Sequence, residues 1–120
     1  MSHTLLLVDD DPLIRRMGEA LLTKAGYDVR TAENGREALD MVRADPPDVV
    51  VTDWLMPELD GLELCRAIRQ AEDVIGRVYV LVLTAQSQPE RLVEAFDAGA
   101  DDYLGKPFHR SELVARIGAG

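Results

Sequence analysis

Three consecutive aspartates, Asp9, Asp10 and Asp11, directly follow a short apolar run, LLLV at residues 5–8. Carboxylates held a few ångströms apart repel one another. A chain that gathers them at the end of a buried strand therefore normally holds a cation or a proton between them. The stretch predicts a site for one or the other.

Further polar residues stand where other apolar runs end. Asp53 follows the run VVVT, Thr84 ends the run VYVLVLT, and Lys106 follows YLG. If these runs are parallel strands of one sheet, their carboxyl ends meet at the same edge. Asp9 and Asp10 would then share that edge with a third carboxylate, a hydroxyl and an ammonium group. This combination has little use in a packed core and indicates a functional site.

The elements that must position these residues follow from the apolar runs. Five runs predict strands, at residues 5–8, 29–32, 49–52, 78–84 and 103–105. Most are continuous rather than alternating, which is typical of parallel strands buried on both faces. Segments with helical periodicity separate them. Strands alternating with helices over short connections predict a doubly wound α/β sheet with right-handed crossovers and helices on both faces.

Helix ends are marked by residues with capping chemistry. These are the candidate N-caps Asp11, Asn34 and Asp60, the opening prolines Pro12 and Pro89, and the closing glycines Gly26 and Gly99. Between them, apolar residues recur at three- and four-residue spacing, which predicts a face that covers the sheet. In the helix that begins at Pro89, this face is expected to be Leu92, Val93 and Phe96.

Composition limits the partners. The chain has 120 residues, which suits one domain, and its net charge of −9 argues against direct binding to nucleic acid or anionic lipid. A single cysteine, Cys65, excludes an internal disulfide and a cysteine-based metal site. Apolar runs stay far below the ~18 residues of a membrane span, and the N-terminus lacks a basic segment. We therefore expect a cytoplasmic protein whose partners are proteins, cations or small molecules.

Four motifs together resemble the receiver domain of two-component response regulators, the CheY-like family. They are VDDDP at 8–12, VVTDWLMPELDGLEL at 50–64, VLVLTAQ at 80–86 and GADDYLGKPF at 99–108. They stand in the order and at the spacing of that family, and the resemblance covers essentially the whole chain. It implies a flavodoxin-like, five-stranded parallel sheet with strand order 2-1-3-4-5. Residues 1–120 are then expected to be one receiver domain, cut from a longer multidomain regulator.

The resemblance implies a phosphoacceptor role for Asp53. A sensor histidine kinase or a histidine phosphotransfer protein would supply the phosphoryl group from a phosphohistidine. Mg²⁺ or Mn²⁺ would be held directly by Asp10 and Asp53, with Asp9 reaching the ion or its waters. The backbone carbonyl of Leu55 would complete this all-oxygen set. The protein would catalyse only its own phosphorylation and dephosphorylation, and would not be an enzyme acting on other substrates.

The resemblance also implies a switch. Lys106 would pair with the phosphoryl oxygens, and Thr84 would donate its hydroxyl to them. Tyr103 would turn inward as Thr84 moves, which changes the surface and controls an output. An output domain after Gly120 and a phosphorylation-dependent dimer are the further partners expected. Since the apolar Leu55 cannot orient an attacking water, hydrolysis of the phosphoprotein is expected to be slow.

Other residues in these motifs, or directly after one of them, are expected to be structural. Asp11 is interpreted as a helix cap, and Asp101 and Asp102 as solvated or capping residues without chemistry. Gly61 is expected to permit a positive φ near a helix start. Cys65 is predicted to lie in the core.

Two alternatives remain open at this point. A haloacid-dehalogenase-like phosphohydrolase would use Asp9 as the nucleophile and Asp11 as the acid/base. Against it, the acidic pair expected after Lys106 is missing, and there is no cap domain to enclose a substrate. A pseudo-receiver would only dock a partner, but such modules typically lack one of the acids or the lysine.

Overall fold

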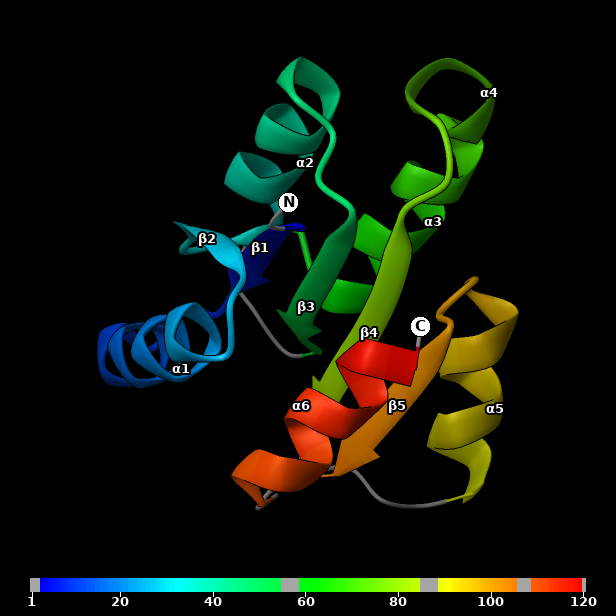
Figure 1. Ribbon diagram of the computed structural model, residues 1–120. Coiled ribbons are helices and arrows are strands. Elements are labelled where there is room, and N and C mark those ends of the chain that lie inside the picture. Colours follow the sequence, from blue (N-terminus) through cyan, green and yellow to red (C-terminus); the bar gives the residue numbers. More distant parts are fainter. Residues whose placement is uncertain (1–2, 55–58, 85–88, 106–108, 120) are drawn as a thin grey trace.

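The computed structural model describes residues 3–54, 59–84, 89–105 and 109–119. Within these ranges five strands form a parallel sheet (Figure 1). They are β1 Thr4–Val8, β2 Asp28–Ala32, β3 Val49–Asp53, β4 Tyr79–Thr84 and β5 Asp102–Gly105. The strand order β2-β1-β3-β4-β5 confirms the predicted topology. The order reverses at β1, so a crevice is expected beyond the carboxyl ends of β1 and β3.

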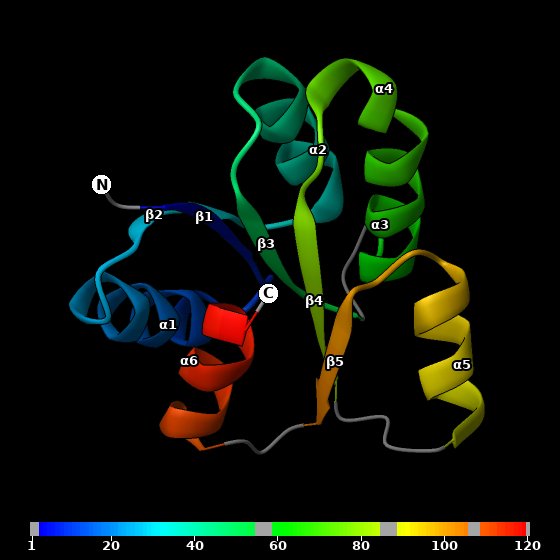
Figure 2. The same ribbon diagram turned by 45° about the vertical axis from the view of Figure 1, so that its right-hand side comes forward.

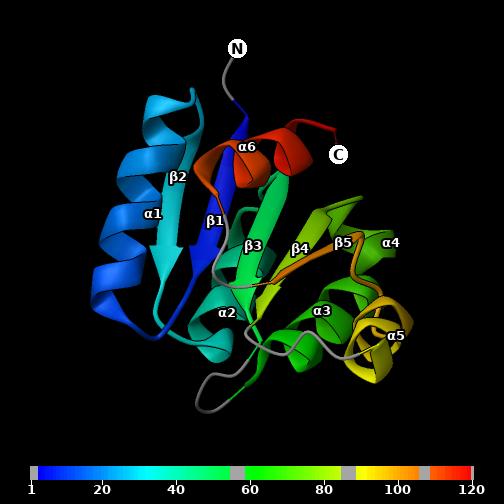
Figure 3. The same cartoon turned by 90° about the horizontal axis from the view of Figure 1, so that it is seen from below.

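Helices cover both faces of this sheet. Their bounds are α1 Pro12–Lys24, α2 Gly35–Ala44, α3 Gly61–Gln70, α4 Glu72–Ile75, α5 Pro89–Asp97 and α6 Arg110–Ala119. α1 and α6 lie on one face, and α2, α3 and α5 lie on the other (Figures 2 and 3). The one-turn helix α4 was not expected from the sequence. Among the described residues, no helix combines the length and the hydropathy needed to cross a membrane.

The strands contribute to a hydrophobic core on each face. In β1, Leu5 and Leu7 pack toward the layer of α1 and α6, while Leu6 and Val8 join the core under α2 and α3. Successive side chains of a strand point to opposite faces, so a strand covered on both sides must be apolar at every position. This accounts for the continuous apolar runs in the sequence. All four side chains are almost completely buried.

Helices α1 and α3 begin at the capping residues that the sequence predicts. The Asp11 carboxylate accepts a hydrogen bond from the Leu13 amide at 2.9 Å. Asp60 and Glu63 form a complete capping box, in which each side chain accepts from the other residue's amide, at 2.8 and 3.1 Å. Such a cap typically stabilises a helix by about 1 kcal/mol. The start of α3 is therefore well fixed directly after the segment that follows β3.

Helix α5 presents a different face to the sheet from the one predicted. Ala95 and Ala98 are buried, whereas Leu92, Val93 and Phe96 are 38, 60 and 45% exposed. Helical periodicity identifies apolar stripes, but it does not choose between two neighbouring stripes. Here the smaller residues are buried, Ala95 within α5 and Ala98 directly after its end. The prediction that the three larger residues cover the sheet was wrong.

The acidic pair before and at the start of β5 is also more buried than expected. The Asp101 side chain is only 15% exposed and forms ion pairs with Arg69, at 2.5 Å, and with Arg77. Asp102 pairs with Arg116 of α6 at 3.1 Å. Asp101 thus ties the C-terminal part of α3 to the chain entering β5, so the expectation of a solvated residue was wrong. The fold tolerates this largely buried carboxylate because its ion pairs and hydrogen bonds compensate for the lost hydration.

Candidate functional site

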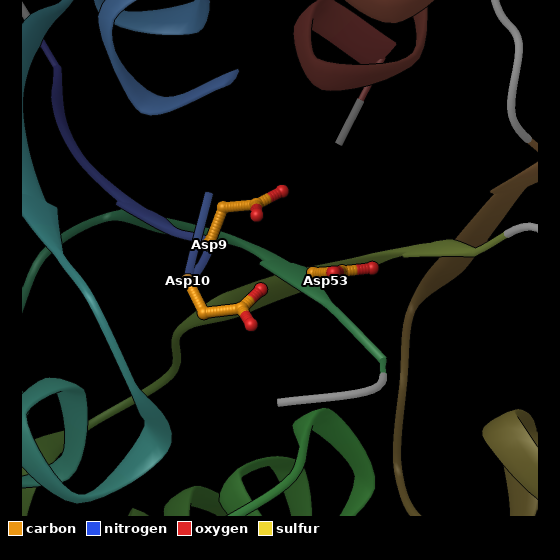
Figure 4. Close-up of side chains that lie close together, drawn as sticks. All are labelled: Asp9, Asp10 and Asp53. Carbon is orange, nitrogen blue, oxygen red and sulfur yellow. The ribbon is translucent and has the colours of Figure 1, made fainter. Parts of the chain in front are cut away.

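Three aspartates from two adjacent strands lie together at the carboxyl edge of the sheet. Asp9 and Asp10 follow β1, and Asp53 ends β3 (Figure 4). Each offers a carboxylate oxygen, and these three oxygens lie within 4.8 Å of one another. The structure therefore brings together the three carboxylates that the sequence assigned to one edge, at the point where the strand order reverses.

The three carboxylates differ in their access to water. Asp9 is 2% exposed, Asp53 is half-buried and Asp10 is exposed. Water screens the charge of Asp10 best and that of Asp9 least, because the effective dielectric constant falls with burial. An opposite charge placed between the three oxygens would relieve their mutual repulsion. The set contains only carboxylate oxygen, the ligand that hard divalent cations prefer, so these residues fit a bound metal ion.

The turn that carries Asp9 is held from several sides. Its amide donates to the carbonyl of Ala32 in β2 at 3.2 Å. Its carboxylate accepts from the Asp11 amide at 2.9 Å, and its own carbonyl accepts from the guanidinium of Arg15 at 2.7 Å. Since Asp11 in turn caps α1, the first helix and the first acidic residues form one connected hydrogen-bonded unit.

Asp53 is fixed by the residues that follow it. The Trp54 amide donates to the Asp53 carboxylate at 2.9 Å, and the Gly61 amide donates to the Trp54 carbonyl at 2.8 Å. A Cβ on Gly61 would stand 2.4 Å from the Asp53 carbonyl oxygen. Gly61 does not have the positive φ that we expected. Glycine is needed there because the helix start and the strand end come too close for a side chain.

Thr84 and Tyr103 lie on the strands beyond Asp53. Thr84 is 1% exposed and pairs with Gly105 at the end of β4. The Tyr103 ring packs edge-on against the ring of Trp54, with centroids 6.4 Å apart and an interplanar angle of 87°. Trp54 therefore links the segment after Asp53 to β5. No role was expected for Trp54 from the sequence, although an aromatic residue directly after an acid at a strand end is a signal that could have found it.

Two predicted site residues, Leu55 and Lys106, lie outside the described residues. Asp11 acts as a helix cap, because its carboxylate accepts a hydrogen bond from the Leu13 amide. This hydrogen bond disfavours the phosphohydrolase alternative, because that mechanism needs the Asp11 carboxylate as a proton donor and acceptor.

The strand order defines a CheY-like flavodoxin fold. The acidic cluster lies where that order reverses, and its carboxylates fit a metal ion. The sequence model of the response regulator receiver domain matches residues 5–118. Response regulator MprA from Mycolicibacterium vanbaalenii is 49% identical over 119 residues, which are 99% of this chain and 50% of that protein. The chain thus belongs to the response regulator receiver domain family.

Solved structures agree with this assignment. Chemotaxis protein CheY4 from Vibrio cholerae matches with a TM-score of 0.91 and 34% identity, over 99% of this chain and 98% of that one. The BeF3-activated DrrB receiver domain matches with a TM-score of 0.86 and 34% identity, over 99% of this chain and 97% of that one. The chain is therefore a receiver domain of the two-component response regulator type, which is a signalling module. It spans about half the length of the curated relatives it matches.

Proposed function

We propose that Asp53 accepts a phosphoryl group from a phosphohistidine on a sensor histidine kinase or a histidine phosphotransfer protein. The observation that carries this proposal is the cluster of Asp9, Asp10 and Asp53 within 4.8 Å. A carboxylate oxygen of Asp53 forms the new O–P bond as the P–N bond breaks. The histidine ring, protonated on its other nitrogen, leaves as neutral imidazole with the electron pair of that bond.

The cation in this proposal is Mg²⁺ or Mn²⁺. Asp10 and Asp53 would hold it directly, Asp9 would bind it or its waters, and the Leu55 backbone carbonyl would add a further oxygen. When bound, the ion neutralises charge on the phosphoryl oxygens, which is most of what phosphoryl transfer needs from its surroundings. The chain's own contribution is to hold the Asp53 oxygen in line with the incoming group. The hydrogen bond from the Trp54 amide to Asp53 supports that role.

The response to phosphorylation is proposed to travel along β4 and β5. Lys106 would pair with the phosphoryl oxygens, Thr84 would donate its hydroxyl to them, and Tyr103 would change position in response. The packing of Tyr103 on Trp54 supports this, because it couples β5 to the residue next to Asp53. Residues 1–120 would act as one receiver domain in the cytoplasm, and the changed surface would control an output or a phosphorylation-dependent dimer.

Labelling and mapping the modified residue test the proposal. The protein is incubated with Mg²⁺ and a small phosphodonor, or with beryllofluoride. Asp53→Asn is expected to abolish stable labelling while the fold persists, because no carboxylate then stands in line. Asp40→Asn, which changes an exposed carboxylate on α2, is the matched control and should label normally.

The mapped residue separates the three readings. Modification at Asp53 supports the phosphoacceptor assignment. Modification at Asp9 would support the phosphohydrolase, and no modification in the folded wild type would support a docking module. Undiminished labelling of Asp53→Asn would overturn the assignment of the acceptor.

A further inference from the structure

Arg15 occupies an unusual place for a cation. It lies in the first turn of α1, where its amide donates to the Asp11 carbonyl at 3.0 Å. The macrodipole of a helix favours negative charge at this end, so helix stability does not account for Arg15. Nevertheless its side chain is only 20% exposed. The guanidinium turns back toward the acidic cluster and donates to the Asp9 carbonyl at 2.7 Å.

A second contact of Arg15 is weaker. Its other terminal nitrogen lies 3.9 Å from a carboxylate oxygen of Glu33, whose side chain is 63% exposed. A hydrogen bond needs a shorter distance than this, and exposed ion pairs contribute little. The charge-assisted bond to Asp9 is therefore the contact that holds the guanidinium.

The bond to the Asp9 carbonyl has a geometric consequence. That carbonyl and the Asp10 amide belong to one planar peptide unit. The Asp9 amide is already fixed by Ala32, and the Asp9 carboxylate by the Asp11 amide. By fixing the remaining carbonyl, Arg15 sets the orientation of the peptide plane between Asp9 and Asp10. This orientation influences the direction in which the exposed Asp10 side chain leaves the backbone.

We propose that Arg15 is a positioning residue for the metal ion, which holds the peptide between Asp9 and Asp10 so that both carboxylates keep their separation from Asp53. This inference rests on the proposed binding of Mg²⁺ by these aspartates. Residues outside the ligand set that orient ligands commonly change metal affinity by about 10- to 100-fold when they are replaced. Arg15 acts through a backbone carbonyl, so we expect the lower end of that range.

The test is a Mg²⁺ titration of Arg15→Lys. Lysine keeps the positive charge but loses the planar fork of donors that reaches the carbonyl, so electrostatic repulsion of Mg²⁺ is unchanged. The fluorescence of Trp54, the only tryptophan in the chain, is the signal for binding. This residue directly follows Asp53, and its backbone amide donates a hydrogen bond to the Asp53 carboxylate. The Kd of Mg²⁺ for Arg15→Lys should be about tenfold higher than that for the wild type. Arg16→Lys, at an exposed neighbouring position, should bind like the wild type.

The outcomes separate this inference from the proposed function. If the wild type itself shows no saturable Mg²⁺ binding, the proposed metal site fails, and this inference with it. If the wild type binds and Arg15→Lys binds equally well, only the inference fails, even when thermal unfolding shows that Arg15→Lys is less stable. Should Arg15→Lys not fold, Arg15→Gln is compared with Arg16→Gln, which loses the same charge. Weaker binding by Arg15→Gln then supports the inference, and equal or tighter binding overturns it.

Discussion

At the scale of single residues, the acidic cluster works against the stability of the fold. Two unit charges about 4 Å apart repel by about 1 kcal/mol in bulk water and by several times that near a protein surface. Asp9, Asp10 and Asp53 bring their oxygens within 4.8 Å, and Asp9 is almost fully buried. Unfolding separates these charges, so we expect the cluster to favour the unfolded chain when no cation is bound.

This repulsion leads to a prediction for Asp10→Asn. The variant removes one repelling charge and one proposed ligand, and it changes an exposed residue whose replacement creates no cavity. We expect it to melt at a higher temperature than the wild type in chelator and to lose most of its stabilisation by Mg²⁺. Thermal melts of both proteins at constant ionic strength measure this. A lower melting temperature in chelator, or a full response to Mg²⁺, would contradict the description of the cluster as a cation site.

A second prediction concerns Cys65. Burial raises the pKa of its thiol from 9.0 to about 11. Between these values the folded chain keeps a proton that the unfolded chain has lost, so the free energy of unfolding falls as pH rises. The contribution is complete below about pH 9 and declines up to about pH 11, by at most roughly 2 to 3 kcal/mol.

The pH effect of Cys65 is measured by urea denaturation of the wild type and Cys65→Ala at several pH values from 8 upward. Burial also raises the pKa of Tyr79, to about 12, but that effect is common to both proteins and cancels in the comparison. The wild type should lose more stability than Cys65→Ala across this interval. Parallel pH profiles would show that the thiol ionises equally in the folded and unfolded chains.

At the scale of the elements, the approach of α3 to β3 determines where Asp53 lies. Gly61 begins α3, and its Cα comes so close to β3 that an added Cβ would meet the Asp53 carbonyl oxygen at 2.4 Å. The capping box of Asp60 and Glu63 fixes the same helix start. Helix and strand cannot separate here without moving the backbone that carries the site.

Gly61→Ala is therefore expected to destabilise the fold by about 1 to 3 kcal/mol, because backbone must shift to make room, and to weaken Mg²⁺ binding as well. Gly118→Ala is the matched control. That position lies in α6, is exposed, and has no atom within 4 Å of an added Cβ. Alanine there should stabilise the helix by up to about 1 kcal/mol. Chemical denaturation of both variants compares them, and an equally tolerated Gly61→Ala would contradict the close approach.

At the scale of the whole molecule, binding of a cation to one edge should stabilise the entire fold. The unfolded chain does not gather the three carboxylates, so a cation that binds them stabilises the folded state by RT ln(1 + [Mg²⁺]/Kd), about 1.4 kcal/mol at ten times Kd. We expect the melting temperature to rise by several degrees at that concentration. It should continue to rise with the logarithm of Mg²⁺ concentration. Melts across a Mg²⁺ series at constant ionic strength test this, and no rise beyond that of NaCl would count against a specific site.

The sequence by itself determined the architecture and the meeting of three carboxylates at one edge of the sheet. Continuous apolar strands must be covered on both faces, which specifies a doubly wound parallel sheet. Parallel strands bring their carboxyl ends to one edge, so the positions of Asp9, Asp10 and Asp53 after apolar runs were sufficient to predict that they meet. Helix starts were equally local, because a capping residue such as Asp60 acts within its own turn.

Only the tertiary structure decided features that depend on partners distant in sequence. Helical periodicity allowed two faces of α5, and only the fold shows that Ala95, together with Ala98 just after the helix, is the buried side. The local sequence indicates a solvated Asp101, because its partner Arg69 lies 32 residues earlier and only the fold brings the two side chains together. The need for glycine at position 61 arises from a neighbouring strand rather than from its own φ. Arg15 likewise looks like an ordinary surface residue of a helix, because nothing local indicates that its guanidinium reaches back to the Asp9 carbonyl.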